Sequence, residues 1–327
     1  MAERFLVTGA FGCIGAWTVK RLVEAGIPVW TYDLPGSGHR LKLILDDDAL
    51  AQVNLVAGDI TDFELFKQTV VDNGITHIVH LAGMQVPFVR ANPILGMQVN
   101  AVGTTVVFET VRQNADQIQG LVYASSAGVY GPAEMYPHGP LAHDAPLAPT
   151  NLYGVTKQAN EGTARIYWHE NGVHSIGLRP YIIYGPGRDQ GMTSTPTKAM
   201  LAAAVGRPYH VSFGGTAVYH HADDAAAVFI RAARTRLAGA PVYNLGGNTV
   251  TMDEIVAAIE TAVPAMRGQI TFEPAQLHTP TAIDDSAINH ALASVHWRPL
   301  TEGVQQTVEL FQTAAGAGKV DVDRILA

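Results

Sequence analysis

A glycine-rich turn after the first apolar segment constrains the fold of this chain more than any other feature. Arg4–Thr8 is typical of a short strand, and Gly9, Gly12 and Gly15 follow it where a helix should begin. Glycines at this spacing permit a tight turn, a close approach of the backbone to a pyrophosphate, and close packing of the helix on the strand. The helix N-terminus adds free N–H groups and a positive dipole end. The turn therefore predicts a strand–helix–strand unit that binds a dinucleotide.

Strand-like and amphipathic helical segments alternate through the first half of the chain. The expected strands are Arg4–Thr8, Pro28–Asp33, Val53–Ala57, His77–Ala82, Leu121–Ser125 and Ser175–Arg179, and the expected helices are Gly15–Ala25, Asp62–Asn73, Leu95–Gln113 and Tyr153–Asn171. Such strands, rich in Val, Ile and Leu, predict a parallel sheet covered on both faces, hence a doubly wound, Rossmann-type α/β fold.

The second half of the chain is richer in turns and predicts a smaller lobe. We expect helices at Thr195–Val205, Met252–Val263 and Glu302–Thr313, and a strand at Val242–Leu245 that returns to the main sheet. The predicted division is a nucleotide-binding domain at residues 1–180, with return segments near 215–250, and a mainly substrate-binding lobe at 181–327.

Asp33 indicates which dinucleotide the site prefers. It closes the second expected strand, 18 residues past Gly15, where a carboxylate can accept hydrogen bonds from a ribose and would repel a 2′-phosphate. This favours NAD over NADP, although Arg40 could still contact a phosphate. Asp59 either accepts from the adenine amino group or caps the next helix, and the sequence leaves both readings open.

Tyr153 and Lys157 are candidates for acid–base chemistry. They stand at positions i and i+4 of an expected helix, so a phenol and an ammonium share one face. A nearby cation should pull the tyrosine pKa from about 10 towards neutrality, as proton exchange with an alcohol near pH 7 requires. Ser125 and Ser126 end a central strand, where a hydroxyl can donate to a substrate oxygen.

The order of these parts along nearly the whole chain resembles the extended short-chain dehydrogenase/reductases, also called the NAD-dependent epimerase/dehydratase family. The matching motifs are Gly9/Gly12/Gly15, Asp33, Gly58-Asp59-Ile60, His80-Leu81-Ala82-Gly83, Asn100, Ser125-Ser126, Tyr153/Lys157, Leu178-Arg179-Pro180, Tyr184-Gly185-Pro186, His221-Ala222-Asp223-Asp224 and Pro299–Gly303.

The resemblance implies roles for individual residues. It makes Ser126, Tyr153 and Lys157 the catalytic set, with Ser125 behind the nicotinamide and Lys157 on its ribose. Asn100 would position the active-site helix. The residues implied to bind NAD are Gly9, Gly12, Cys13, Ile14, Gly15, Asp33, Asp59, Ile60, Leu81, Ala82, Gly83, Asn100, Ser125, Tyr153, Lys157, Pro180 and Ile183. It also implies a homodimer built on Leu95–Gln113 and Tyr153–Asn171.

The chain departs from the family at positions that narrow its chemistry. Dehydratases of the family carry Asp-Glu after the catalytic Thr, where this chain has Ala127 and Gly128, so dehydration is not expected. Nucleotide-sugar epimerases of the family carry an arginine that binds the substrate diphosphate, at about the position of Ala217 in this chain. The absence of that arginine here favours a smaller substrate. Candidate substrate-binding residues, from polar segments at the expected cleft, are Met84, Gln85, Ser126, Arg188 and Thr193.

These observations predict hydride transfer between NAD and a secondary alcohol or ketone of a small sugar-like or hydroxy-acid substrate. One alternative is a nucleotide-sugar epimerase that keeps its NAD tightly bound. A second is an NAD-binding regulator without chemistry, which the intact Ser126/Tyr153/Lys157 set disfavours.

Charge and cysteine content exclude several other classes. The formal net charge is −8 and there is no basic run, so neither nucleic acid nor an anionic membrane is an expected partner. The single cysteine, Cys13, allows no internal disulfide, and the histidines show no recognised metal-ligand spacing. We therefore expect no metal. The apolar run Phe5–Val7 is too short for a signal sequence and glycines follow it at once, so we expect a cytoplasmic location.

Overall fold

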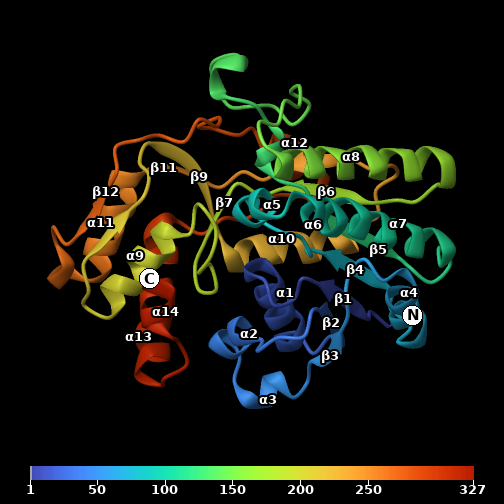
Figure 1. The fold of residues 1–327 in the computed structure, drawn as a ribbon, viewed down its shortest axis with the longest axis horizontal. Helices are drawn as coiled ribbons and strands as arrows, with labels where there is room; N and C mark the ends of the chain where they lie inside the picture. The colour runs from blue at the N-terminus through green and yellow to red at the C-terminus, as the bar shows by residue number, and fades with distance from the viewer. Residues whose placement is uncertain (1) are drawn as a thin grey trace.

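The computed structural model describes residues 2–327 and is built around a seven-stranded parallel sheet (Figure 1). The strand order is β10-β6-β5-β4-β1-β2-β3. The strands are β1 (Phe5–Thr8), β2 (Val29–Asp33), β3 (Asn54–Ala57), β4 (His77–His80), β5 (Gly120–Ala124), β6 (Ile176–Arg179) and β10 (Val242–Asn244). The predicted Rossmann-type fold is confirmed. The expected strand at Val242–Leu245 does return to the main sheet, where β10 pairs with β6.

Helices cover both faces of this sheet because side chains alternate along each strand. Phe5 and Val7 of β1 pack with α1 (Cys13–Glu24) and α10 (Ala222–Arg234), whereas Leu6 packs on the opposite face. That opposite face is covered by α4 (Phe63–Asp72), α7 (Gly103–Gln113) and α8 (Leu152–Asn171). The carboxyl ends of the strands therefore open between two helical layers, where ligands bind in such folds.

The expected helix Leu95–Gln113 is not one regular helix. The structure has α6 (Pro93–Met97), a π-helical turn η1 (Gln98–Val102) and then α7. By length and composition the whole stretch Pro93–Gln113 could cross a membrane, but half of it is buried inside the protein. Core helices of soluble proteins pass the same test, so the stretch is weak evidence for a membrane span. The expected cytoplasmic location stays a prediction.

A smaller lobe lies beside the large sheet, in yellow, orange and red in Figure 1. It contains a three-stranded sheet of β7 (Ile182–Tyr184), β9 (Thr216–His221) and β11 (Asn248–Thr251), and a two-stranded sheet of β8 (Tyr209–Val211) and β12 (Ile270–Phe272). Its own apolar core is formed with α9 (Thr195–Ala204), α11 (Met252–Ala262) and α13 (Leu300–Gly316). The predicted division at residue 180 falls between β6 and β7 and stays a prediction.

Short helices complete the chain. They are α2 (His39–Ile44), α3 (Asp47–Leu50), α5 (Val86–Ala91), α12 (Ser286–Ala291) and α14 (Val322–Leu326), with 3₁₀ turns at Ala127–Val129, Ala133–Met135 and Pro264–Met266. Of these, α2 and α5 flank the open ends of the strands and contribute side chains to the cavities described below.

Candidate active site

The glycine-rich turn forms a cradle that side chains would fill. Gly9 has φ +65°, and a Cβ there would lie 2.6 Å from the backbone nitrogen of Ala82. A Cβ on Gly15 would lie 2.2 Å from the carbonyl oxygen of Gly9. Gly12 is the N-cap residue of α1, so the first N–H groups of that helix face this cradle. The turn therefore fits the pyrophosphate of a dinucleotide.

A cavity of about 460 Å³ runs from this turn over the ends of β2 and β3. Among the predicted NAD-binding residues, its lining includes Gly9, Gly12, Cys13, Asp33, Asp59, Ile60, Leu81, Ala82 and Gly83. The Asp33 carboxylate accepts hydrogen bonds from the N–H groups of Phe11 (2.8 Å) and Leu34 (2.9 Å). Burial raises the pKa of Asp33 despite these bonds. This half of the site suits the adenosine of NAD.

Of the two readings of Asp59 left open by the sequence, the helix cap is wrong and the contact with adenine stays a prediction. Asp59 lines the cavity, and its carboxylate also accepts from the backbone N–H and hydroxyl of Thr61. The residue that caps α4 is Asp62, whose carboxylate accepts from the N–H of Leu65.

Arg40 is bound to the protein itself. Its guanidinium donates to Asp189 through Nε (2.9 Å) and Nη2 (2.5 Å), and to the Phe11 carbonyl oxygen through Nη1 (2.8 Å). His39 also contacts Asp189, at 3.0 Å. These contacts fasten α2 to the turn after β7 and leave Arg40 with little free capacity for a phosphate.

A second cavity, of about 270 Å³, continues from the first one over the ends of β1, β4 and β5. Its lining brings together predicted residues from widely separated parts of the chain. They are Gly9, Gly12, Cys13, Ile14, Gly15, Leu81, Gly83, Met84, Gln85, Ser125, Ser126, Tyr153, Lys157, Pro180, Ile183, Arg188 and Thr193. The predicted catalytic set and the predicted substrate residues thus share one cavity with the glycine-rich turn.

Tyr153 and Lys157 lie close together near the start of α8, with the lysine Nζ 5.7 Å from the tyrosine ring centre. The Nζ donates to the carbonyl oxygen of Ala124 at 2.7 Å, and burial lowers the Lys157 pKa to about 8. Burial raises the pKa of Tyr153, while a hydrogen bond with Ser126 and the charge of Arg188 lower it. The expectation that Lys157 pulls this pKa towards neutrality is therefore wrong for the protein alone, because burial outweighs the nearby charges.

The Ser125 hydroxyl points to a buried ion pair that the sequence analysis missed. It donates to Glu161 at 2.5 Å, and Arg179 donates to both oxygens of the same carboxylate, at 2.8 and 2.7 Å. Glu161 stands four residues after Lys157 on the same helix, and this spacing is the signal that could have identified it. Ser125 therefore joins the end of β5 to α8, rather than presenting its hydroxyl to the cavity.

Asn100 is fully buried and lines neither cavity. Its side chain accepts from the N–H of Met84 (2.7 Å) and donates to the Met84 carbonyl oxygen (3.0 Å) and to the Thr156 hydroxyl (3.2 Å). The expectation that Asn100 contacts the cofactor is therefore wrong. Its side chain instead hydrogen-bonds the Met84 backbone and Thr156, and so holds the segment after β4 against α8. The contact with Thr156 links Asn100 to α8, the helix that it was expected to position.

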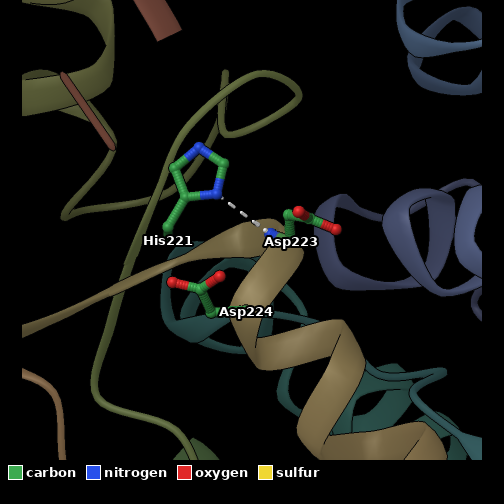
Figure 2. Close-up of side chains that lie close together, drawn as sticks. All are labelled: His221, Asp223 and Asp224. Atoms are coloured by element: carbon green, nitrogen blue, oxygen red, sulfur yellow. Dashed lines mark hydrogen bonds between the residues drawn. The ribbon is translucent and has the colours of Figure 1, made fainter. Parts of the chain in front are cut away.

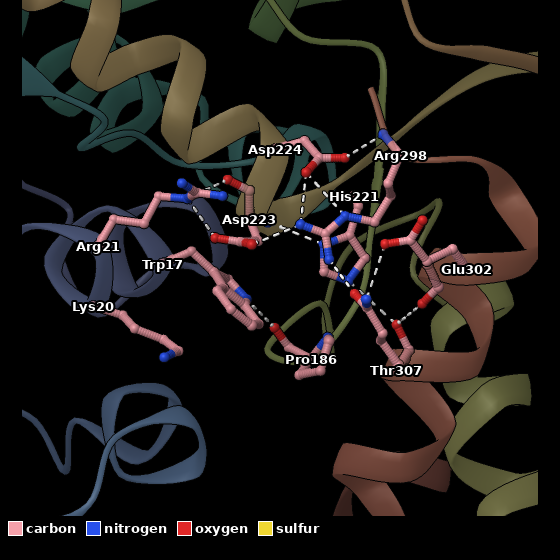
Figure 3. Close-up of polar contacts among 12 residues, drawn as sticks. Trp17, Lys20, Arg21, Pro186, His221, Asp223, Asp224, Arg298, Glu302 and Thr307 are labelled. Carbon is pink, nitrogen blue, oxygen red and sulfur yellow. Dashed lines mark hydrogen bonds and ion pairs between the residues drawn. The ribbon is translucent and has the colours of Figure 1, made fainter. Parts of the chain in front are cut away.

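One group of side chains in the described residues has the proximity of metal ligands: His221, Asp223 and Asp224 lie within 4.8 Å of one another (Figure 2). Arg298 donates to both carboxylates at 2.6 Å, and Arg21 of α1 donates to Asp223 at 2.5 Å (Figure 3). Burial and the charge of Arg298 lower the His221 pKa to about 4. Since the arginines already neutralise the carboxylates, we assign the group to holding α1, α10 and the segment before α13 together.

Comparisons with known proteins agree with this geometry. The sequence profile of the NAD dependent epimerase/dehydratase family matches residues 5–246. The UDP-glucose 4-epimerase of Azospirillum brasilense is 31% identical over 79% of this chain and 77% of its own.

Among solved structures, an L-threonine dehydrogenase from Cupriavidus necator is 25% identical with a TM-score of 0.81, covering 94% of this chain and 99% of its own. A UDP-glucose 4-epimerase from Thermotoga maritima has the same fold at 22% identity, with a TM-score of 0.81 over 96% of this chain and all of its own.

Proposed function

Because the chain belongs to the NAD-dependent epimerase/dehydratase family, whose cofactor is NAD, we propose that it reversibly oxidises a secondary alcohol on a small sugar-like or hydroxy-acid substrate. The observation that carries this proposal is the single cavity in which Ser126, Tyr153 and Lys157 lie beside the glycine-rich turn. That arrangement suits proton exchange with a substrate oxygen next to a nicotinamide ring.

Each catalytic side chain has a distinct part in the proposed reaction. Bound NAD supplies the hydride acceptor. Tyr153 takes the hydroxyl proton as the substrate C–H bond breaks, and it returns a proton in the reverse direction. Ser126 holds the reacting oxygen and, through its bond to the phenol, favours the phenolate. Lys157, fixed on the Ala124 carbonyl oxygen, keeps a positive charge beside the ring.

Three positions argue against dehydration and against a nucleotide-sugar substrate. Ala127 and Gly128 follow Ser126 directly and cannot transfer protons, which disfavours dehydration. Ala217 is 3% exposed in β9 and pairs with Val250, so no arginine reaches the cavity from there. Without that contact a nucleotide diphosphate loses a charge-assisted anchor.

Epimerisation is the second candidate function, favoured by the relatives named UDP-glucose 4-epimerase. It would use the same three side chains, with the hydride returned to the opposite face of a transient ketone. The two candidates differ in one measurable respect, because an epimerase produces no net NADH.

The test is a panel of secondary alcohols incubated with NAD and followed at 340 nm. Steady NADH formation supports the proposal, and substrate inversion without absorbance change supports the second candidate. Tyr153→Phe should lower kcat by a factor of about 10² to 10⁴, because it removes the acid–base group. Unchanged turnover in that variant would contradict the catalytic assignment.

We also propose a homodimer. Apolar side chains stay exposed on α5, α6, η1 and α8: Phe88, Ile94, Leu95, Met97, Val102, Leu152, Val155 and Ile166. A soluble enzyme rarely leaves so many large apolar side chains uncovered, and a second copy related by two-fold symmetry would cover them.

A further inference from the structure

We propose that Arg188 binds a carboxylate of the substrate, which makes the substrate a hydroxy acid rather than a neutral polyol. This rests on the proposed oxidation, and it names the substrate class of the same cavity.

The turn that carries Arg188 is held from several sides. The indole Nε1 of Trp17 donates to the Pro186 carbonyl oxygen at 2.9 Å, visible in Figure 3, and the N–H of Gly185 donates to the Thr197 hydroxyl at 3.2 Å. The backbone N–H of Arg188 donates to the Gly185 carbonyl oxygen, at 3.1 Å. The next residue, Asp189, is fastened to Arg40. A side chain on such a turn is positioned before any ligand arrives.

The guanidinium of Arg188 has unused donors in a partly buried place. Nη2 donates to the Thr193 hydroxyl at 3.0 Å and Nη1 to the Gln85 oxygen at 3.4 Å, which leaves a second N–H on each of these two nitrogens. Nε has no partner and is closed off from the cavity. Within residues 2–327 Arg188 makes no ion pair, and the adjacent carboxylate of Asp189 is taken by Arg40 and His39. A buried guanidinium without an anion is costly, and a planar carboxylate is the acceptor that its fork geometry fits best.

Arg188 faces the reacting groups. It lines the same cavity as Ser126 and Tyr153, and its charge lowers the pKa of Tyr153. Gly191 packs closely against the contact between Gln85 and Arg188, since a Cβ there would lie 2.0 Å from the Gln85 Oε1 and 3.3 Å from Nη2 of Arg188. The close approach of this backbone helps to hold the guanidinium in place at the cavity.

The charge of the cavity favours a carboxylate over a phosphate. Its cationic lining residues, in the part of the chain that the structure describes, are Lys157 and Arg188. Lys157 is committed to Ala124 and Tyr153. The N–H groups of the glycine-rich turn are left to the pyrophosphate of NAD. The remaining guanidinium balances a single negative charge on the substrate, whereas a phosphate ester brings nearly two.

The experiment compares hydroxy acids and sugar acids of three to six carbons, each paired with its primary amide and with a phosphate ester of matching length. Wild type should oxidise an acid with kcat/KM at least 10-fold above that of its amide. Arg188→Met should lower kcat/KM for the acid by about 10- to 100-fold more than kcat/KM for the amide, because both substrates share the effect of Arg188 on Tyr153 and only the acid loses a charged partner. For Arg188→Lys we expect kcat/KM for the acid to lie between the values of wild type and Arg188→Met, because lysine keeps the positive charge but cannot make the two parallel hydrogen bonds of a guanidinium.

A second variant tests the idea without altering Arg188. Gln85→Glu places a carboxylate where the 3.4 Å contact to Nη1 now lies, so it should occupy the guanidinium and abolish the preference for acids. Gln52→Glu, the same change at an exposed position, should keep the preference. NAD affinity, measured by calorimetry on the proteins without substrate, should be equal in wild type and Arg188→Met.

The outcomes separate this inference from the proposed function. Three results would overturn the carboxylate assignment and leave the proposed oxidation standing. The first is equal oxidation of acids and amides, and the second is a preference for the phosphate ester. The third is a loss of NAD affinity in Arg188→Met with an unchanged acid-to-amide ratio. If nothing is oxidised, the proposed function fails. Calorimetric titration of the acids and amides into the NAD complexes of wild type and Arg188→Met then decides the carboxylate assignment alone.

Discussion

We expect the hydroxyl of Ser126 to act on the proposed reaction in two ways that a pH profile can separate. It lies where a substrate oxygen would bind, and its hydrogen bond lowers the pKa of Tyr153 against the effect of burial. Removing the hydroxyl should therefore weaken catalysis at every pH and also change the pH at which the tyrosine ionises.

For Ser126→Ala we expect the rise of kcat/KM for alcohol oxidation to move to higher pH. The sign follows from the base role: oxidation needs the phenolate, whose fraction grows as pH rises towards the Tyr153 pKa, and losing a contact that lowers this pKa moves the rise upwards. Ser126→Thr keeps the hydroxyl and should keep the wild-type midpoint. A uniform fall in rate without a shift would show that Ser126 only binds substrate.

The sequence identified most of the residues that line the site and missed those that hold them. Tyr153, Lys157 and Ser126 stand in short local patterns, so their neighbourhood could be predicted. The pairing of Arg179 with Glu161, 18 residues apart, depends on β6 lying beside α8 in space, and no local pattern encodes that. The pKa of Tyr153 was mispredicted for the same reason, because burial is a property of the whole fold.

At the scale of elements, the strands of the main sheet were predictable and those of the two smaller sheets were not. The main-sheet strands consist of Val- and Ile-rich runs between helices, and their bounds agree with prediction to within about two residues. By contrast β8 (Tyr209–Val211) lies in a segment that looked like a turn, and it becomes a strand only by pairing with β12, some sixty residues later. The π-helical turn η1 likewise depends on distant contacts, namely those of Asn100 to Met84 and Thr156.

The start of α10 should be the most sensitive of the element junctions. Arg298→Met leaves Asp224, whose side chain is 8% exposed, without its counter-ion, so we expect the free energy of unfolding to fall by about 3–5 kcal/mol. Guanidinium denaturation followed by fluorescence measures this loss.

Arg207→Met is the matched control for that junction. It breaks an exposed ion pair with Asp323, whose side chains are 50% and 83% exposed, and should cost less than about 1 kcal/mol. Equal losses in the two variants would mean that the buried group contributes no more than a surface pair.

At the scale of the whole molecule, the exposed apolar side chains of α6 and α8 predict how copies associate. The double variant Ile94→Glu with Ile166→Glu puts charges on both helices and should convert a dimer into monomers, as measured by light scattering after size-exclusion chromatography. Leu55→Glu, at an exposed leucine on the edge strand β3, should leave the dimer intact. A monomeric wild type at micromolar concentration would contradict the proposed dimer.

The turn after β7 couples substrate specificity to the attachment of α2 beside the nucleotide cavity, two properties that protein engineers usually wish to vary separately. Arg188 turns towards the cavity of Tyr153, and its neighbour Asp189 turns towards Arg40 and the glycine-rich turn. A loop graft that exchanged this turn for another specificity would also release α2 from the nucleotide side. New specificities are therefore more accessible through Met84, which lines the same cavity from the segment after β4, than through the loop that carries the arginine.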